Sequence, residues 1–494
     1  NYKNKAKLNR ELIVKRNLTL EEIARFEIRK HRFPGALIDE RYSRENLYPN
    51  LFSHSIGYVG NIDDDMLEEI LFDQELQPKE TIFRYSNGNL IGKTGLENIY
   101  DNDLRGFFGK KIYEVDASGK LLREIEEIPE IDGKDIYTSL NLETQKVAYT
   151  QLNNRRGAVV AVDIRNGAIV SYLSSPSFSV NKISNGLSNK EFNKLLNDKD
   201  KPFFDRAAQG RYSPASTIKP AIGLYGIESK IIDWNYFIND PGFFILPEDG
   251  KIFRGWKKGG HGNINLNNAI IESSNTFFFS LAYKSDINEL IEHLSNFGFG
   301  KNVCVDCFLP DKGLLPSPTW KMNNLNFGWV KGDTVNLGVG QGYMSATPIQ
   351  LAYYAAFLAN KGTLNEFSFV QDAEETAKNT LIAININDND WEKIHRSMIG
   401  VIESSKGTAT RLRELKDFTI AAKSGTVELV STETKEDYKI IREVEEKRDH
   451  AIIIAFGPMP NPKYAVSVVI ENGESGGSVA GPVAIAVLNS LLEE

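Results

Sequence analysis

Ser216-Thr217-Ile218-Lys219 places a lysine three positions after a serine, in a chain of 494 residues. A serine hydroxyl is a weak nucleophile until a base takes its proton. Residues three apart share one face of a helix, so Lys219 is expected within reach of the Ser216 hydroxyl. Burial beside other cations lowers the proton affinity of a lysine, which would let Lys219 act as that base.

The flanking residues predict where the helix begins. Pro220 needs no hydrogen-bond donor in the first turn of a helix, and the apolar run 221–225 follows it. A helix beginning near Ser216 would place the nucleophile at the positive end of the helix dipole. The alternative interpretation makes Ser216 a helix N-cap and Lys219 a surface cation, and the tetrad alone does not decide between the two.

A second motif, Ser273-Ser274-Asn275, stands directly before three phenylalanines. Ser273 would relay a proton between Lys219 and the leaving group, and Asn275 would hold Lys219 and a substrate amide. Taken alone, the motif could also be the N-cap of a core helix over Phe277–Tyr283.

A third motif, Lys423-Ser424-Gly425-Thr426, closes the apolar run 418–422. Gly425 would let a substrate backbone lie flat against the strand, while Lys423 and the two hydroxyls would bind a carboxylate. The backbone N–H groups of Ser216 and Thr426 would form an oxyanion hole, usually the largest single catalytic contribution. Alone, this motif fits an ordinary strand end with a glycine bulge. The three motifs in this order are typical of enzymes that transfer acyl groups through an active-site serine.

Longer runs carry a more specific resemblance than the three motifs, which sister families share. The chain resembles the class B penicillin-binding proteins, and within that class the penicillin-binding protein 2 group of the cell-elongation machinery. The runs are Arg-Phe-Pro-Gly at 32–35, His-Ser-Ile-Gly-Tyr-Val-Gly at 54–60, Gly-Lys-Thr-Gly-Leu-Glu at 92–97, Trp-Lys-Lys-Gly-Gly-His-Gly at 256–262 and Gly-Gln-Gly-Tyr at 340–343.

The resemblance implies a D,D-transpeptidase that cross-links peptidoglycan stem peptides through an acyl-serine and is inhibited by β-lactams. It implies no cofactor, and as partners a RodA-type glycosyltransferase and MreC. Relatives carry an N-terminal membrane anchor, and no apolar run here approaches the ~20 residues that span a bilayer. We therefore expect a chain truncated at its start, from a protein anchored in the inner membrane with its catalytic domain in the periplasm.

Composition agrees with this class and excludes others. A hydrophobic content of 41% and a charged content of 25% are ordinary for soluble globular domains, and the length predicts two or more domains. The net charge of −8, without a long basic stripe, argues against a nucleic-acid partner.

The predicted organisation is an extended N-terminal pedestal over residues 1–135 and a catalytic domain over residues 136–494. The catalytic domain is expected to be α+β, with one antiparallel sheet packed by helices, as in the penicillin-binding and serine β-lactamase-like fold. The segments predicted as strands or extended are 107–125, 136–141, 158–164, 168–173, 451–456 and 464–470, and those predicted as helices are 20–30, 145–152, 286–296, 349–359 and 481–492. Arg165-Asn166-Gly167 predicts a hairpin between 158–164 and 168–173. Capping boxes of Thr19 with Glu22 and of Thr347 with Gln350 predict the starts of the helices over 20–30 and 349–359. Residues 442–449, densely charged with both signs, are interpreted as a solvated loop near the site.

Cys304 and Cys307 are the only cysteines. Residues three apart on an extended segment point to opposite faces, which disfavours a local disulfide. We expect two small apolar residues in a packed loop, although an extracytoplasmic setting leaves a disulfide open. A four-sulfur zinc site would need a second pair.

The resemblance also raises a zinc site, which some members of the family hold beside the Ser-x-Asn motif with two aspartates, a histidine and a cysteine. Asp240 and His261 match two of these positions, but Gly255 and Ser274 occupy the others. Two ligands do not make a structural zinc site, so no metal is expected.

Two rival functions remain from other classes. A penicillin-sensing receptor domain would be acylated without cross-linking anything, but the large pedestal argues against a compact sensor. A class A β-lactamase needs a Glu-x-x-Leu-Asn loop, and Glu292 and Asn296 reproduce only its outer spacing, with Ser295 in place of leucine. These residues fall in an amphipathic pattern, so we interpret them as a helix face.

Overall fold

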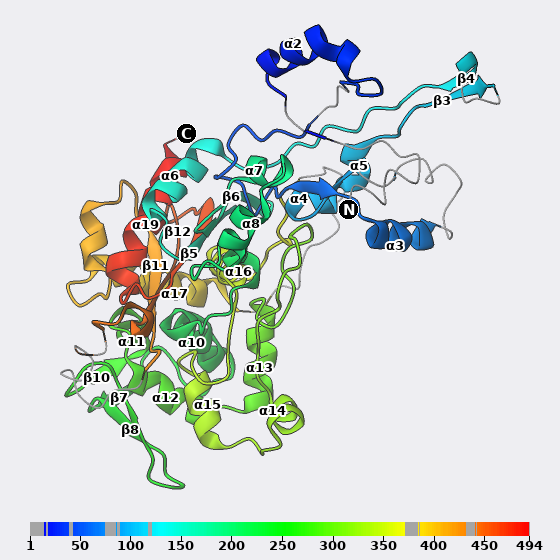
Figure 1. The fold of residues 1–494 in the computed structure, drawn as a ribbon. Helices are drawn as coiled ribbons and strands as arrows, with labels where there is room; N and C mark the ends of the chain where they lie inside the picture. The colour runs from blue at the N-terminus through cyan, green and yellow to red at the C-terminus, as the bar shows by residue number, and fades with distance from the viewer. Residues whose placement is uncertain are drawn as a thin grey trace.

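The computed structural model describes residues 14–15, 18–38, 43–74, 85, 89–116, 121–370, 384, 386–430, 440 and 442–493. The N-terminal elements project from one end of a larger body, which begins near residue 142 (Figure 1). Among the residues that the structure describes, no helix has the length and apolar character required to cross a membrane.

A five-stranded antiparallel sheet forms the centre of the body, in the order β11-β12-β13-β5-β6. β5 and β6 are the predicted hairpin, and β12 and β13 are the two predicted strands beside the Lys423 strand. Helices cover both faces, so nearly every residue of the strands is buried. The strands are β5 (Gly157–Asp163), β6 (Ala168–Ser175), β11 (Ala421–Val427), β12 (His450–Gly457) and β13 (Tyr464–Ile470).

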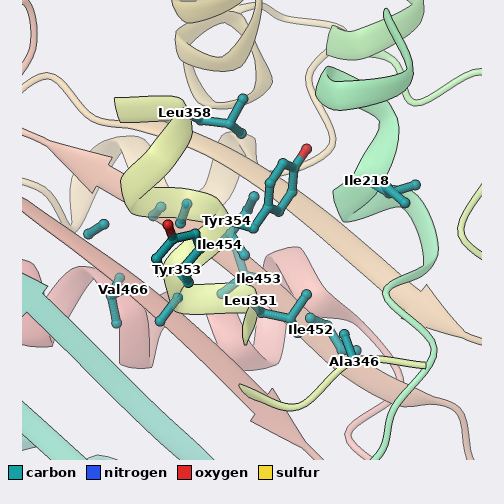
Figure 2. Packing of buried hydrophobic residues seen from close by; sticks show 14 of the residues in the cluster. Ile218, Ala346, Leu351, Tyr353, Tyr354, Leu358, Ile452, Ile453, Ile454 and Val466 are labelled. Atoms are coloured by element: carbon teal, nitrogen blue, oxygen red, sulfur yellow. The ribbon is translucent and has the colours of Figure 1, made fainter. Parts of the chain in front are cut away.

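Helix α16 (Pro348–Ala359) is buried at all twelve positions, because it lies between the sheet and the other helices. Thr347 and Gln350 form the capping box that the sequence predicts. Figure 2 shows Tyr353 and Tyr354 of this helix beside the isoleucines of β12. The Tyr354 hydroxyl accepts a hydrogen bond from the Ala221 N–H at 3.2 Å, so this core helix fixes the start of α10 (Lys219–Glu228).

The remaining elements of the body surround this core. They are α6 (Leu142–Leu152), α7 (Val180–Ser184), α8 (Asn189–Leu196), α9 (Arg206–Gln209), η3 (Ala215–Ile218), β7 (Phe237–Asp240), β8 (Phe243–Ile245), β9 (Ile252–Arg254), β10 (Gly262–Asn265), α11 (Leu266–Ile271), α12 (Asn275–Lys284), α13 (Ile287–Asn296), α14 (Pro318–Leu325), α15 (Lys331–Leu337), α17 (Asp388–Glu403), η4 (Thr410–Glu414), η5 (Glu445–Lys447), η6 (Gly476–Ala480) and α19 (Gly481–Leu492). Glu292 lies exposed on α13, as the helix-face interpretation expects.

The pedestal elements make little core of their own. α2 (Leu20–Arg29) begins at the predicted Thr19–Glu22 capping box and has no buried residue. β3 (Lys110–Val115) and β4 (Leu121–Ile128) pair as a hairpin that projects from the body (Figure 1). The other elements are η1 (Lys30–Arg32), β1 (Val59–Asn61), α3 (Asp64–Gln74), β2 (Leu90–Gly92), α4 (Gly95–Ile99) and α5 (Asp101–Arg105).

The pedestal joins the body through buried polar contacts. His54 is buried, and its Nε2 donates to the Pro202 carbonyl at 2.9 Å. The His54 ring packs edge-on against the ring of Phe178. Burial lowers the pKa of His54, so the ring is neutral at this contact. The Tyr100 hydroxyl donates to Asp306 at 3.1 Å, which ties α4 to the body.

The predicted strand over 136–141 is wrong. Thr138 makes only an isolated bridge to Val370, and Tyr137 is 82% exposed. The chain then turns at Asn141, whose side chain caps α6 by accepting from the Thr144 N–H. Backbone hydrogen bonds from Ser139 to Phe369 and from Asn141 to Val170 also hold the segment, but they do not extend into a ladder.

Cys304 and Cys307 form a disulfide, which corrects the expectation of two unpaired apolar residues. Their Cα atoms lie 5.6 Å apart, a separation that disulfides span. The expectation assumed an extended segment, but the chain bends at Val305 and Asp306, which brings both side chains to one side. Asp306 accepts hydrogen bonds from the backbone N–H groups of residues 369 and 370 inside this bend.

Candidate active site

The turn that carries Ser216 is the 3₁₀ helix η3, which leads directly into α10 at Lys219. The predicted helix start is therefore right in position, but its first turn is 3₁₀. Ser216 is half-buried and Lys219 is completely buried. Ala215 has a positive φ of 47°, a strained conformation for alanine, and its N–H donates to the Gly340 carbonyl at 3.0 Å.

Lys219 is held by the second motif. Its Nζ donates to Asn275 Oδ1 at 2.7 Å, to the Ser273 carbonyl at 2.9 Å and to Ser273 Oγ at 3.2 Å. Burial lowers the pKa of Lys219 far below its ordinary value, and the charge of Lys423 lowers this pKa further. The charge of Asp240 acts in the opposite direction. Lys219 therefore has the property that a base working near neutral pH needs.

Ser273 lies between two lysines. Lys423 Nζ, also completely buried, donates to Ser273 Oγ at 3.0 Å and to the Ser424 carbonyl at 3.0 Å. Burial lowers the pKa of Lys423 to about 7. Ser273 has a positive φ of 55°, which turns its hydroxyl and its carbonyl toward Lys219 together. Four of the predicted site residues thus meet in one buried cluster: Lys219, Ser273, Asn275 and Lys423.

The second motif fits both of its interpretations. The Ser274 side chain accepts from the Phe277 N–H and caps α12, whose first residue is Asn275. The capped helix packs its phenylalanines into the core, and its N-terminal turn carries the residues that hold Lys219.

Gly425 lies against the turn that carries the nucleophile. A Cβ at this position would lie 3.1 Å from Thr217 Cγ2 and 3.2 Å from the Pro214 carbonyl oxygen. The missing side chain thus makes room for η3 against β11, and its role in letting a substrate backbone lie flat stays a prediction. Glycine here fixes the distance between the third motif and the nucleophile turn.

The hydroxyls of the third motif face different surroundings. Ser424 Oγ lies 2.8 Å from the hydroxyl of Thr408, whereas Thr426 is exposed. Among the described strands, β11 pairs only with β12, so its other edge can receive an extended peptide. The oxyanion hole of Ser216 and Thr426 stays a prediction.

Asp240 holds Ser274 and His261 by hydrogen bonds beside the second motif. Asp240 Oδ2 accepts from Ser274 Oγ and from His261 Nδ1, both at 2.6 Å, and Oδ1 accepts from the Gly242 N–H at 2.7 Å. Burial opposes the charged carboxylate, but these hydrogen bonds outweigh it and lower the pKa of Asp240.

These residues do not fit a zinc ion. Gly255 offers no side chain, and the Ser274 hydroxyl is committed to Asp240. His261 Nε2 has no partner among the described residues, but one imidazole and one carboxylate fall short of the four ligands of a structural site. No group of three or more potential His, Cys, Asp or Glu ligands occurs in the described ranges. The absence of zinc stays a prediction.

Three residues beside the site have no assigned role in the sequence motifs. Trp256 donates its indole N–H to the Ser273 carbonyl at 3.1 Å. Glu272 is buried next to Ser273, and Thr408 contacts Ser424 across sixteen residues of sequence. Trp256 lies in one of the family-specific runs, which is a usable signal. Nothing in the sequence places Thr408 beside the third motif.

Two family models cover most of the chain. The description "Penicillin binding protein transpeptidase domain" matches residues 157–489, and "Penicillin-binding Protein dimerisation domain" matches residues 1–138. The three motifs lie within the first match and the pedestal within the second.

Curated relatives match nearly the whole of this chain. The chain is 39% identical over 483 residues to the peptidoglycan D,D-transpeptidase MrdA of Acinetobacter baumannii, which covers 96% of this chain and 70% of that protein. It is 35% identical to the Escherichia coli K12 protein of the same name over 473 residues, 94% of this chain and 74% of that one.

Solved structures agree in fold. Pseudomonas aeruginosa PBP2 in complex with WCK 5153 superimposes with a TM-score of 0.79 at 34% identity, covering 92% of this chain and 91% of that one. PBP2 of Helicobacter pylori in complex with MreC superimposes with a TM-score of 0.83 at 29% identity, covering 96% of this chain and 84% of that one. The chain belongs to the class B penicillin-binding proteins, in the penicillin-binding protein 2 group of the MrdA relatives.

Proposed function

We propose that this protein is a peptidoglycan D,D-transpeptidase that cross-links stem peptides during cell elongation, thereby maintaining cell shape. The observation that carries the proposal is the Ser273 hydroxyl, which lies between two buried ammonium groups, Lys219 at 3.2 Å and Lys423 at 3.0 Å. Half-buried Ser216 lies in the turn that leads into Lys219. A lysine of lowered pKa at that position, bridged by a hydroxyl to a second lysine, provides a proton-transfer site for acyl transfer.

In the acylation step, neutral Lys219 takes the proton from the Ser216 hydroxyl as Oγ attacks the carbonyl of the penultimate D-alanine. The N–H groups of Ser216 and Thr426 stabilise the oxyanion. When the peptide bond breaks, the proton passes through Ser273 to the departing D-alanine amine. An ester on Ser216 remains, with Lys219 neutral again.

In the second step, the amine of an acceptor stem peptide attacks the ester carbonyl. The acceptor loses a proton to Lys219, a new amide forms, and Ser216 leaves with a proton. Ser424 and Thr426 bind the substrate carboxylate beside Lys423, and the free edge of β11 aligns the peptide. β-Lactams enter the same path and leave a penicilloyl ester on Ser216.

A cross-linking assay tests the proposal. Uncross-linked glycan strands made from lipid II are incubated with the protein, digested and analysed for cross-linked muropeptides by mass spectrometry. We expect cross-links with the wild-type protein and none with Ser216→Ala or after treatment with penicillin. An equal yield from Ser216→Ala would overturn the assignment of the nucleophile.

A β-lactamase is the rival enzyme class, and release of the acyl group separates the two. Hydrolysis needs a second base that places water against the ester, and Glu292 lies on a helix face. The penicilloyl-enzyme should therefore persist for many minutes, as followed by intact-mass spectrometry after free drug is removed. Return to the unmodified mass within seconds would favour a hydrolase.

The proposal also includes the domain boundary, the location of the protein in the cell and its partners. We place the domain boundary at residues 135 and 136, and the catalytic domain in the periplasm on an inner-membrane anchor. The Helicobacter pylori complex supports MreC as a partner at this fold. A RodA-type glycosyltransferase would supply the glycan strands that this enzyme cross-links. Cross-linking also separates the enzyme from a penicillin sensor, which would be acylated without making cross-links.

A further inference from the structure

Two lysines meet over one buried carboxylate at the edge of the site. Lys257 Nζ lies 3.8 Å from Glu272, and Lys406 Nζ lies 3.6 Å from the other oxygen of the same carboxylate. The Glu272 side chain is 8% exposed, whereas those of Lys257 and Lys406 are 44% and 70% exposed. The ammonium groups therefore reach solvent while the carboxylate beneath them does not.

The contacts between the lysines and Glu272 are loose. Direct charge-assisted hydrogen bonds are about 2.7–2.9 Å long, and both separations here are larger by most of an ångström. Glu272 accepts no hydrogen bond from the described residues. Neither lysine is thus locked to its partner, and each can turn to another anion.

Each lysine lies within two residues, along the chain, of a side chain that contacts the catalytic groups. Trp256, next to Lys257, donates to the same Ser273 carbonyl that Lys219 contacts. Thr408, two residues after Lys406, contacts the Ser424 hydroxyl of the third motif. The lysines therefore approach the Ser-x-Asn motif from two separate loops.

The charge balance decides which ligand fits. Two ammonium groups share one carboxylate, and Asp240, a carboxylate that contacts the Ser-x-Asn motif, is already committed to His261 and Ser274. The rim therefore carries excess positive charge, and an ammonium ligand would be repelled while an anion would be attracted.

We propose that Lys257 and Lys406 form a subsite for a carboxylate carried by the stem peptide, separate from the carboxylate bound at Lys423. The inference rests on the proposed function. An arriving carboxylate displaces Glu272 as the partner of the two ammonium groups, so a stem peptide with a free carboxylate beside the reacting residue binds better than its amidated form.

A matched pair of β-lactams tests the subsite. Carbenicillin differs from benzylpenicillin by one carboxylate on the side chain, so the ratio of their second-order acylation rate constants isolates that group. We expect the ratio of carbenicillin to benzylpenicillin to fall about two- to fivefold in Lys257→Ala and in Lys406→Ala, the size of an exposed ion pair. Lys258→Ala is the control, because it removes the same charge one residue away, outside the pair.

Glu272→Gln should change the ratio of carbenicillin to benzylpenicillin in the opposite direction. Removing the competing carboxylate leaves both ammonium groups free, so the ratio should rise. If the lysines served only to neutralise Glu272, the ratio would not respond to any of these changes. A constant ratio in both lysine variants, an equal fall in Lys258→Ala, or a fall in Glu272→Gln would overturn the subsite, and a response from one lysine alone would overturn the pairing.

Failure of the subsite and failure of the function are distinguishable. If benzylpenicillin does not acylate the wild-type protein, the proposed function fails. If it acylates normally while the ratio stays constant, only the subsite fails. Thermal unfolding of each variant checks that the buried Glu272 substitution leaves the fold intact.

Discussion

The catalytic body and helix α2 of the pedestal use polar residues in opposite ways. In the body, Lys219 and Lys423 are completely buried, and burial changes their acid–base chemistry. In the pedestal, α2 has no buried residue and its charged side chains pair in solvent. The difference indicates that a polar residue acquires chemical function here through the core around it, while α2 presents surface. Substitutions should therefore have large effects on activity in the buried site and small ones in α2.

Lys219→Met should give the largest effect. Acylation by a fluorescent penicillin should fall by roughly 10²–10⁴, the usual contribution of a general base. The unfolding temperature should change little, because a buried amine is replaced by an apolar chain of similar length. Stopped-flow fluorescence and calorimetry measure the two quantities, with the exposed Lys190→Met on α8 as the control. Acylation within twofold of wild type would remove Lys219 from the mechanism.

Gly425→Ala tests the packing of the nucleophile turn. The new Cβ would meet Thr217 Cγ2 at 3.1 Å, so η3 must shift by a few tenths of an ångström. We expect acylation to fall by about 10- to 100-fold, since small misplacements of reacting groups are costly, with a loss of about 1–3 kcal/mol in stability from overpacking. Gly328→Ala is the matched control, because its Cβ meets nothing within 4 Å. Equal behaviour of the two variants would contradict the close approach.

Lys423→Met tests the coupling of the two buried lysines. The charge of Lys423 lowers the pKa of Lys219, so its removal should raise that pKa. Acylation requires neutral Lys219 and falls as the pH drops through its pKa, so the acidic limb of the pH–rate profile should move to higher pH. The limb position is the readout, because the absolute rate also loses carboxylate binding. A shift to lower pH would contradict the coupling.

Thr19→Ala should give the smallest effect. Loss of this N-cap removes about 1 kcal/mol from the helix, which has no core contact to transmit the change. Hydrogen exchange over residues 20–29 should become faster, while acylation and the main unfolding transition stay at wild-type values. A measurable drop in acylation would show that α2 communicates with the site.

The sequence predicts best those features whose signal is local. The hairpin of β5 and β6, the capped helix α16 and the spacing of the three motifs all follow from turn chemistry, caps and periodicity. The predicted strand over 136–141 fails because the segment makes separate contacts with Val370, Phe369 and Val170, all distant in sequence, instead of one continuous ladder. The sequence reasoning disfavours the disulfide because it assumes an extended segment, and nothing in the sequence signals the bend at Val305 and Asp306.

Within the site, residue types could be predicted but their packing could not. The chemistry of Ser-x-x-Lys requires a serine and a base, which sequence shows directly. The role of Gly425 depends on how close η3 comes to β11, and the Thr408–Ser424 contact depends on the path of a loop between two helices. Both features depend on contacts between residues that are distant in sequence, and no periodic pattern in the sequence indicates them.

The central claim is that Ser216 carries the acyl group, and peptide mapping tests it most directly. The protein is labelled with a fluorescent penicillin, digested, and the labelled residue is located by tandem mass spectrometry, with Ser216→Ala in parallel. We expect one modified residue, Ser216, and no label in Ser216→Ala, whose unfolding temperature stays near that of wild type. A label on another residue, or undiminished labelling of a folded Ser216→Ala protein, would contradict it.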